Sequence, residues 1–192
     1  GYISGKLLQD HVVKAEILLH GSFATTGIGH GTDKALIAGL LGMRPDDIRI
    51  PDSFFLAKKD GMEFSFSTIT LKDAHPNTAV LRLTGEHGRK IEVQAASIGG
   101  GRILIAKLDG IEVNFSAEKP TLIVHNVDQP GHVAQVTSML AEKQVNIATL
   151  QLYRDKRGGY AVMVIETDQE VPEESVAWLE QLDGIIKVTY IN

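Results

Sequence analysis

The residues best suited to chemistry gather in one stretch, residues 20–33, which reads HGSFATTGIGHGTD. Glycines at alternate positions 27, 29 and 31 predict a backbone that bends through positive φ and lets a ligand approach closely. His30 lies among them, where an imidazole can accept or relay a proton near neutral pH. The stretch therefore predicts a pocket for a small carboxylate or phosphate.

Three side chains of this stretch are the predicted catalytic residues: His30, Ser22 and Asp33. His30 is the candidate for proton transfer, because a histidine flanked by glycines has little to pack against. Ser22 suits either a carboxylate ligand or the cap of a turn. Asp33 suits a helix cap or an orienting partner of His30 better than a catalytic acid, and pairing with a substrate ammonium stays open.

Two further polar segments complete the predicted site. His75-Pro76-Asn77-Thr78 is a turn in which proline favours an extended backbone at His75. In Ser97-Ile98-Gly99-Gly100-Gly101, three successive glycines favour close approach of a ligand, although a bulge would also need them. The residues predicted to bind substrate are Gly29, Gly31, Thr32, His75, Asn77, Thr78, Ser97, Gly99 and Gly100. A metal site built from His20, His30 and His75 matches no local signature, and we assign no metal ligand.

The elements that must position these residues follow from hydrophobic periodicity. Residues 15–19 predict a strand before the stretch, and residues 35–41 a helix after it, capped by Thr32 or Asp33 and ending near Gly42. Further helices are expected at residues 3–13 and 53–59, and strands at 62–67, 79–83, 90–95, 103–108 and 111–115. The last two strands flank the hairpin signal Asp109-Gly110. Residues 1–116 are thus predicted as an α+β domain with a mostly antiparallel sheet.

Residues 120–192 predict a second domain. Strands are expected at 121–125, 147–153, 160–166 and 186–191, and helices at 132–143 and 172–182. This βαββαβ order is that of the ferredoxin-like fold. The boundary falls near residues 116–120, because the net charge is zero before residue 117 and −5 after it, and 15 of the 19 glycines precede it.

Composition narrows the classes of function. The chain has 192 residues, 43% of them hydrophobic, and no cysteine, which excludes disulfides and any iron–sulfur cluster held by its own thiolates. A net charge of −5 without a Lys/Arg-rich run argues against nucleic acid and anionic membranes as partners. No apolar run is long enough to span a bilayer, and the start lacks a signal-peptide pattern, so we expect a cytoplasmic protein. The missing initiator Met suggests an upstream piece.

Two segments of the second domain resemble an ACT domain: Asn126-Val127-Asp128-Gln129-Pro130-Gly131 and Val145-Asn146-Ile147. Members of that family sense amino acids, and their ligands usually lie between two paired domains. The resemblance implies an effector site of Asn126, Asp128, Gly131 and Asn146, a homodimer formed through this domain, and L-serine as the natural effector. ACT folds also serve purely as pairing surfaces.

Four motifs ahead of that domain resemble the β subunit of bacterial iron–sulfur L-serine dehydratase: His20-Gly21-Ser22, Gly29-His30-Gly31-Thr32-Asp33, His75-Pro76-Asn77-Thr78 and Ser97-Ile98-Gly99-Gly100-Gly101. That family converts L-serine to pyruvate and ammonia, a reaction of amino-acid metabolism and gluconeogenesis. The resemblance implies a cysteine-containing α subunit whose [4Fe-4S] cluster acts as a Lewis acid on the leaving hydroxyl, and a lyase that is inactive without it. The family's Ser-Ser-Ser-His-Thr motif is not found in this sequence, so its second active-site histidine is not placed.

Two alternatives remain at this stage. The allosteric-substrate-binding domain of some phosphoglycerate dehydrogenases shares the architecture, so the chain could be a non-catalytic regulatory module of a serine-pathway enzyme. A stand-alone metal hydrolase is the third interpretation. The lyase interpretation makes a specific geometric prediction, namely that residues 21–33, 75–78 and 97–101 lie together around one site.

Overall fold

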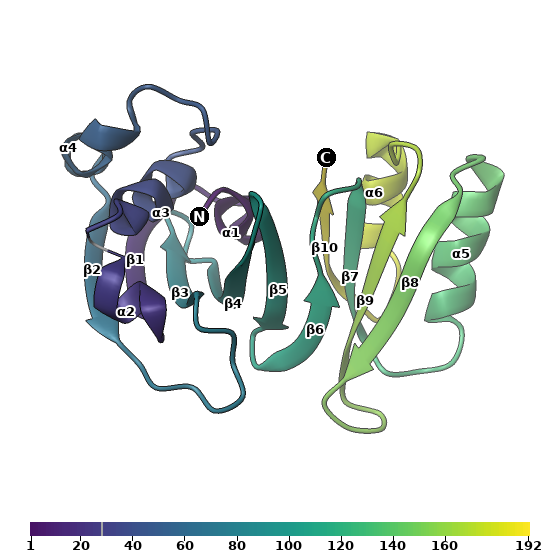
Figure 1. Ribbon diagram of the computed structural model, residues 1–192. Helices are drawn as coiled ribbons and strands as arrows, with labels where there is room; N and C mark the ends of the chain where they lie inside the picture. The colour runs from purple at the N-terminus through teal and green to yellow at the C-terminus, as the bar shows by residue number, and fades with distance from the viewer. Residues whose placement is uncertain (28) are drawn as a thin grey trace. The chain divides into compact units, whose positions relative to one another are not determined.

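The computed structural model describes residues 1–27 and 29–192, and it divides into two compact units, Gly1–Gly110 and Ile111–Asn192 (Figure 1). Ile28, which belongs to the predicted glycine-rich pocket, lies outside the described residues. The helices of the described part of the chain are too short or too polar to cross a lipid bilayer.

The first unit combines short helices with a twisted sheet. Its helices are α1 (Tyr2–Leu8), α2 (Ser22–Thr26), α3 (Thr32–Leu40) and α4 (Ser53–Lys59), the last preceded by the 3-10 turn η1 (Ile50–Asp52). Its strands are β1 (Val12–Leu19), β2 (Glu63–Thr68), β3 (Thr78–Gly85), β4 (Lys90–Gly99) and β5 (Arg102–Leu108), in the spatial order β2-β1-β3-β4-β5. Among the strand pairs of the described residues in this unit, β1–β2 is parallel, with helices between the two strands in sequence, and the β1–β3, β3–β4 and β4–β5 pairs are antiparallel. The mostly antiparallel sheet predicted for this domain is confirmed.

The first helix is shorter than predicted. It ends at Leu8, because Gln9 takes a left-handed conformation with φ 55°, and the chain then enters β1 at Val12 instead of remaining helical to residue 13. The Asp10 carboxylate accepts the backbone N–H groups of His11 and His87, each at 2.9 Å, which holds the chain between α1 and β1. A β-branched residue at Val12 favours the strand that follows.

The turn between β5 and β6 (Ile111–Phe115) has the backbone that the Asp109-Gly110 pair predicts. Asp109 has φ 48° and Gly110 has φ 82°, the two positive values of a two-residue type I′ turn. The strand β6 begins the second unit.

The second unit has the ferredoxin-like order that the sequence predicts. Strand β7 (Thr121–Val127) leads to helix α5 (His132–Glu142), strands β8 (Ile147–Arg154) and β9 (Tyr160–Thr167), helix α6 (Glu173–Glu180) and strand β10 (Ile185–Ile191). The strands lie in the antiparallel order β10-β7-β9-β8, so β7 and β9 are central and β8 is an edge strand.

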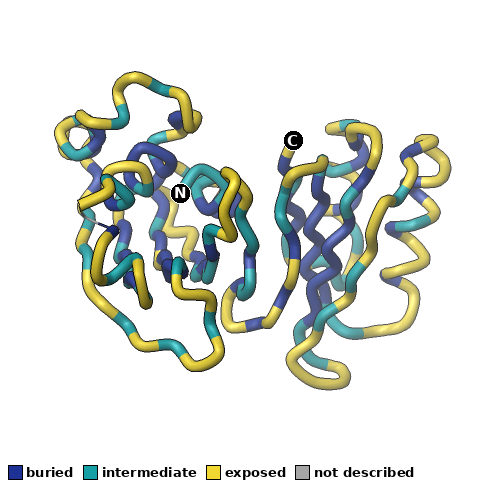
Figure 2. The backbone as a smooth tube through the Cα atoms, in the orientation of Figure 1, coloured by how far each residue is buried: buried dark blue, intermediate teal, exposed yellow. Residues whose placement is uncertain are grey.

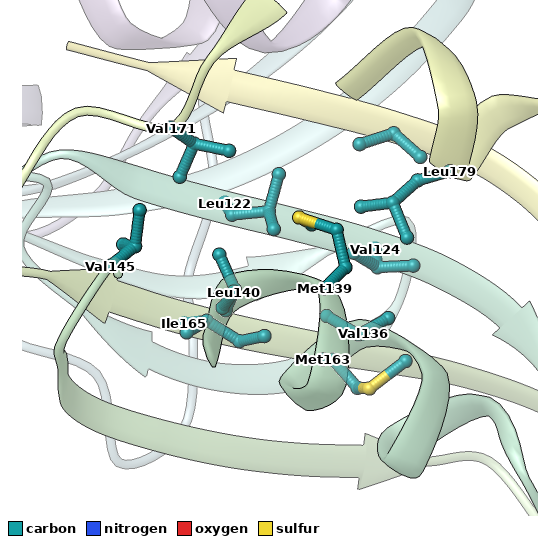
Figure 3. Packing of buried hydrophobic residues seen from close by; sticks show 11 residues of the cluster. Leu122, Val124, Val136, Met139, Leu140, Val145, Met163, Ile165, Val171 and Leu179 are labelled. Atoms are coloured by element: carbon teal, nitrogen blue, oxygen red, sulfur yellow. The ribbon is translucent and has the colours of Figure 1, made fainter. Parts of the chain in front are cut away.

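The core of this unit lies between its helices and its sheet. Leu122 and Val124 from β7 meet Val136 and Leu140 from α5, all with 0% exposure, as the close-up in Figure 3 shows. Both central strands are buried along nearly their whole length, whereas α5 alternates buried and exposed positions (Figure 2). Apolar residues on both faces of the central strands are expected for strands that are covered on both sides.

Candidate active site

Three of the predicted motifs meet at one edge of the first sheet. The backbone N–H of His20 donates to the carbonyl of Thr78 at 2.9 Å, and that of Ser22 donates to the carbonyl of Pro76 at 2.8 Å. The N–H of Ser97 donates to the carbonyl of Asn77 at 2.9 Å. Sheet register explains this meeting, because β1 ends where its antiparallel neighbour β3 begins, and β4 ends beside that same point.

Gly21 is the position that makes this approach possible. Its backbone has φ 57° and ψ −126°, a conformation that residues with a side chain avoid. A Cβ built on Gly21 would lie 2.5 Å from the carbonyl oxygen of Pro76 and 2.9 Å from its Cα. This position therefore requires glycine for two reasons: its backbone conformation and its close contact with Pro76.

The sequence predicts a bare loop over residues 20–33, and the structure confirms this prediction only in part. Ser22–Thr26 forms the short helix α2, in which the Thr26 hydroxyl donates a 2.9 Å hydrogen bond to the Ser22 carbonyl. Gly27 then has a right-handed φ of −58°, so the prediction of a positive φ was wrong at this position. Gly31 does take a positive φ, of 73°.

The predicted cap of α3 was also wrong. Gly31 is the N-cap, with no side-chain hydrogen bond, while Thr32 and Asp33 are the first residues of the helix. The carboxylate of Asp33 is nonetheless close to the helix start, since it is buried and accepts the backbone N–H of Lys34 at 2.8 Å. Negative charge in the first turn of a helix is favourable, which gives Asp33 a structural reason to be acidic.

The ring of His30 is oriented by a hydrogen bond to the backbone. Its Nδ1 lies 2.8 Å from the carbonyl of Thr26, and because a carbonyl can only accept, Nδ1 must carry the ring proton. The neutral ring therefore presents an unprotonated Nε2, and the residue is exposed to solvent. Thr26, whose carbonyl accepts this hydrogen bond, is the last residue of α2. The helix α2, which the sequence did not predict, therefore orients the His30 imidazole.

His75 has the opposite tautomer. Its Nδ1 accepts the backbone N–H of Asn77 at 3.1 Å, so the neutral ring carries its proton on Nε2. His75 is exposed as well. The two histidines thus differ in role, with His30 able to accept a proton and His75 able to donate a hydrogen bond.

The remaining predicted residues divide by exposure. Ser22 is exposed in the first turn of α2, while Thr32, Asn77 and Ser97 are half-buried. Thr78 is buried, and its hydroxyl donates to the carbonyl of His75 at 2.6 Å, which closes the turn that carries His75. The Thr78 hydroxyl therefore affects the site by holding the backbone of His75.

His20 joins β1 to the segment after β2. Its Nδ1 accepts the backbone N–H of Leu71 at 3.2 Å and lies 3.3 Å from the carbonyl of Ile69. This half-buried ring therefore holds two neighbouring segments together. In the described part of the chain, no group of three or more His, Asp or Glu side chains could hold a metal ion.

The glycines after Ser97 form a hairpin turn. Gly99, Gly100 and Gly101 have φ values of 88°, 62° and 76°, and a Cβ added at any of them would meet nothing within 4 Å. Backbone conformation at the β4–β5 connection therefore explains these glycines. The turn still lies next to the site, because Ser97 is bonded to Asn77.

In the second unit, the predicted effector residues lie at two opposite ends of the sheet. Asn126 and Asp128 lie where β7 ends, beside the start of β9 at Tyr160, and Gly131 is the N-cap of α5 with φ 109°. Asn146 precedes β8, whose first residue pairs with Thr167 at the other end of β9. One copy of the domain therefore does not bring all four residues together.

The group at the end of β7 has unusual polar features. The Asp128 carboxylate accepts the N–H of Gly158 at 2.9 Å and the Arg154 guanidinium at 3.0 Å, and these bonds lower its pKa below the usual value. The Oδ1 atom of Asn126 is buried without a hydrogen-bond partner, and so is Nε2 of His132. Sequence reasoning missed His132, although its place directly after Gly131, at the start of a helix, was a usable signal.

Taken together, these features define a two-domain subunit, in which an α+β domain with histidines at one sheet edge precedes a ferredoxin-like domain of the ACT type. The family model for ACT domains matches residues 120–184, and that for the serine dehydratase beta chain matches residues 3–59.

Two relatives match nearly the whole of this chain. The chain is 36% identical to the L-serine dehydratase beta chain of Peptoniphilus asaccharolyticus, over 99% of this chain and 86% of that protein. It is 37% identical to a probable L-serine dehydratase beta chain of Bacillus subtilis, over 100% of this chain and 86% of that protein. The chain therefore belongs to the family of L-serine dehydratase beta chains. A D-3-phosphoglycerate dehydrogenase of Methanocaldococcus jannaschii is 28% identical over the whole of this chain, which spans only 36% of the dehydrogenase.

Proposed function

We propose that this chain supplies the proton-transfer side of the active site of an L-serine ammonia-lyase, and that it is inactive until an α chain joins it. The observation that carries the proposal is the set of backbone hydrogen bonds that join residues 20–22, 76–78 and 97 at one sheet edge. His75 directly precedes the joined residues 76–78, and the exposed His30 follows α2, the helix that begins at the joined residue Ser22. Their rings have complementary tautomers. The cytoplasm is the proposed location.

The sequence has no cysteine, the usual ligand of an iron–sulfur cluster. We therefore place a [4Fe-4S] cluster on cysteines of the α chain, where it would supply Lewis acidity to the leaving hydroxyl.

The residues of this chain would carry the proton and the polar contacts. Nε2 of His30 takes the α-proton of L-serine, the C–H electron pair forms the C=C bond, and the C–O bond breaks to release hydroxide. The resulting aminoacrylate becomes an imine, and water converts it to pyruvate and ammonia. In this proposal, Ser22 and the Nε2–H of His75 donate hydrogen bonds to the substrate carboxylate.

The test is turnover of the assembled enzyme. His30→Ala should lower kcat by about 10²–10⁴-fold, the usual contribution of a general base, while leaving assembly with the α chain intact. His11→Ala is the matched control, because His11 is a half-exposed histidine that contacts Asp60 and lies beyond the other end of β1. Near-normal pyruvate formation by the His30→Ala enzyme would refute the role given to His30.

For the second domain we propose a homodimer that senses L-serine. β8 is an edge strand, and Leu150 and Leu152 on it are 37% and 46% exposed. If two β8 strands pair antiparallel about a two-fold axis, the start of each lies beside the end of the other. Asn146 of a second copy then approaches Arg154, which holds Asp128. Pairing thus brings together the effector residues that one copy keeps apart.

Two measurements separate sensing from mere pairing. Leu152→Asp should convert the dimer to a monomer in size-exclusion chromatography and abolish the heat of L-serine binding in calorimetry. Asn146→Ala should abolish the heat and leave the dimer, with Gln181→Ala, at the exposed end of α6, as control. A dimer whose wild-type form gives no heat with L-serine would leave the domain only a pairing role.

A further inference from the structure

A hollow in the second unit lies between its two helices, and we call it the helix groove. Its volume is about 610 Å³, within the range typical of small-molecule sites. Helix α5 lines it with Ala134, Ser138 and Glu142, and helix α6 lines it with Glu174 and Trp178. None of the residues predicted to bind the effector belongs to the lining in the described part of the chain. The helix groove is therefore a site to which no role has yet been given.

The spacing of residues along the two helices creates the space. Ala134, Ser138 and Glu142 are one turn apart, so they share one face of α5, as Glu174 and Trp178 share one face of α6. Both helices are fixed on the same core, since Leu140 of α5 and Leu179 of α6 are fully buried in it (Figure 3). The small side chains of Ala134 and Ser138 leave room beside the large indole ring of Trp178.

An ion pair marks one end of the groove. Nζ of Lys143, directly after α5, lies 3.3 Å from Oε1 of Glu174, in the first turn of α6. The end of α5 thus lies beside the start of α6. Trp178 is four residues further along α6, about 6 Å at a rise of about 1.5 Å per residue. The groove therefore has charged groups at one end and an aromatic ring one helical turn away.

Two polar groups of the lining have no partner. Among the described residues, none forms an ion pair or a hydrogen bond with the Glu142 carboxylate, whereas Lys143 is already paired with Glu174. The groove thus retains one uncompensated negative charge. Ser175 also lines it, and the hydroxyl oxygen of this residue is buried with no hydrogen-bond partner in the described part of the chain. A buried polar group is costly until something pairs with it, so a ligand that donates a hydrogen bond is favoured.

The other lining groups suit an apolar ligand. Trp178 is 43% exposed, and the buried Met139 also contributes to the lining. Covering an exposed indole with an apolar group removes apolar surface from water, which is favourable. Thioethers and indoles both make favourable contacts with aromatic rings, and the face of an indole also attracts cations.

We propose that the helix groove binds an organic ammonium ion, namely a primary amine joined by a short chain to an aromatic or branched apolar group. The ammonium pairs with Glu142, and the apolar group covers Trp178 and Met139. The uncompensated charge sets the sign of the ligand, because a carboxylate in place of the amine meets Glu142 and finds Lys143 already paired. The distance of one helical turn sets its length. This site goes beyond the proposed sensing of L-serine, which has no apolar group and is assigned to other residues.

Trp178 is the only tryptophan of the chain, so its fluorescence reports on the groove directly. The probe is 2-phenylethylamine, in which two carbons separate an ammonium from a phenyl ring. Titration into the full chain should change the fluorescence saturably, with a Kd below about 1 mM, a value within the limits for so small a ligand. The charge-reversed probe 3-phenylpropionate should bind more weakly by about tenfold or more.

Three variants locate the binding. Ser138→Phe should abolish it by filling the groove, and Glu142→Gln should weaken it by about fivefold through loss of an exposed ion pair. Glu180→Gln is the matched control, because Glu180 is an exposed carboxylate at the end of α6 outside the lining, and its Kd should stay within about twofold of wild type. Calorimetry repeats each titration without relying on the indole, and the thermal unfolding midpoint checks that each variant folds.

Absence of both a saturable fluorescence change and a heat of binding with 2-phenylethylamine would overturn the proposal. Equal affinity for 3-phenylpropionate would overturn the assigned charge, and unchanged affinity in Ser138→Phe would overturn the assigned place. None of these results bears on L-serine sensing, because Leu152→Asp and Asn146→Ala test that role at residues outside the groove.

Discussion

Gly21 is the residue on which the geometry of the site depends most directly, and Gly21→Ala tests that dependence. The new methyl group would start 2.5 Å from the Pro76 carbonyl oxygen and 2.9 Å from the Pro76 Cα, both of them backbone atoms. Because neither can move as a flexible side chain does, the two segments must separate. The hydrogen bond from the Ser22 N–H to the Pro76 carbonyl, now 2.8 Å, would lengthen or break.

The expected cost has two parts. A side chain at φ 57° and ψ −126° costs about 1–3 kcal/mol in backbone strain, and loss of one backbone hydrogen bond adds about 0.5–1.5 kcal/mol. Gly21→Ala should therefore destabilise the chain by about 1.5–4.5 kcal/mol, the sum of those two ranges. Separation of residues 20–22 from 76–78 should also reduce turnover, since misplacing catalytic groups by about 1 Å can cost 10²-fold.

Gly42→Ala is the matched control for backbone strain. Gly42 has φ 79°, but a Cβ there would meet nothing within 4 Å, and it lies beyond the end of α3. Urea unfolding of the isolated chain and pyruvate formation by the α–β enzyme should show a stability loss in both variants and an activity loss in Gly21→Ala only. If Gly21→Ala matched the control in stability and kept full turnover, the contact between these segments would not be what builds the site.

Two pH effects follow from histidines outside that site. Burial of His125 lowers its pKa from 6.5 to about 4. Between these two pH values His125 is protonated in the unfolded chain but not in the native chain. The free energy of unfolding should therefore fall by about 3 kcal/mol as pH drops from 6.5 to 4. His125→Gln should flatten the dependence in urea titrations at pH 7 and pH 4, and an unchanged slope would contradict this. At the surface, the Asp10 carboxylate, 2.8 Å from Nδ1, raises the pKa of His87. The His87–Asp10 pair stabilises the fold below pH 6.5 and loses this effect as pH rises through the raised pKa of His87. Asp10→Asn should return the His87 pKa toward 6.5 in an NMR titration. A His87 pKa that stays high would mean that another group raises it.

Local patterns predicted the elements whose residues repeat or alternate. The βαββαβ order of the second unit, the strand before His20 and the helix after Asp33 all follow from hydrophobic periodicity, which survives in any tertiary context. The Asp109-Gly110 turn was predictable because two positive φ values in succession require such residues.

Where glycines or polar residues cluster, the pattern was ambiguous. Successive glycines are compatible with a ligand-binding loop, a helix end or a hairpin turn, and the structure uses Gly27 as a helix end and Gly99 to Gly101 as a turn. The hydrogen bond from the Thr26 hydroxyl to the Ser22 carbonyl within α2 is likewise one that no periodicity reveals. The predicted catalytic and substrate-binding roles remain predictions for the assays above.

The sequence by itself determined the two-domain order, the absence of thiolate ligands and the set of motifs that could do chemistry, because these are properties of residue type and spacing. Only the tertiary structure decided that residues 20–22, 76–78 and 97 meet, since strands far apart in sequence are brought together by sheet register. It also decided the tautomers of His30 and His75, because each depends on which backbone group the fold places beside Nδ1. Tertiary structure likewise put Asn146 and Asp128 at opposite ends of one sheet, a separation set by strand order.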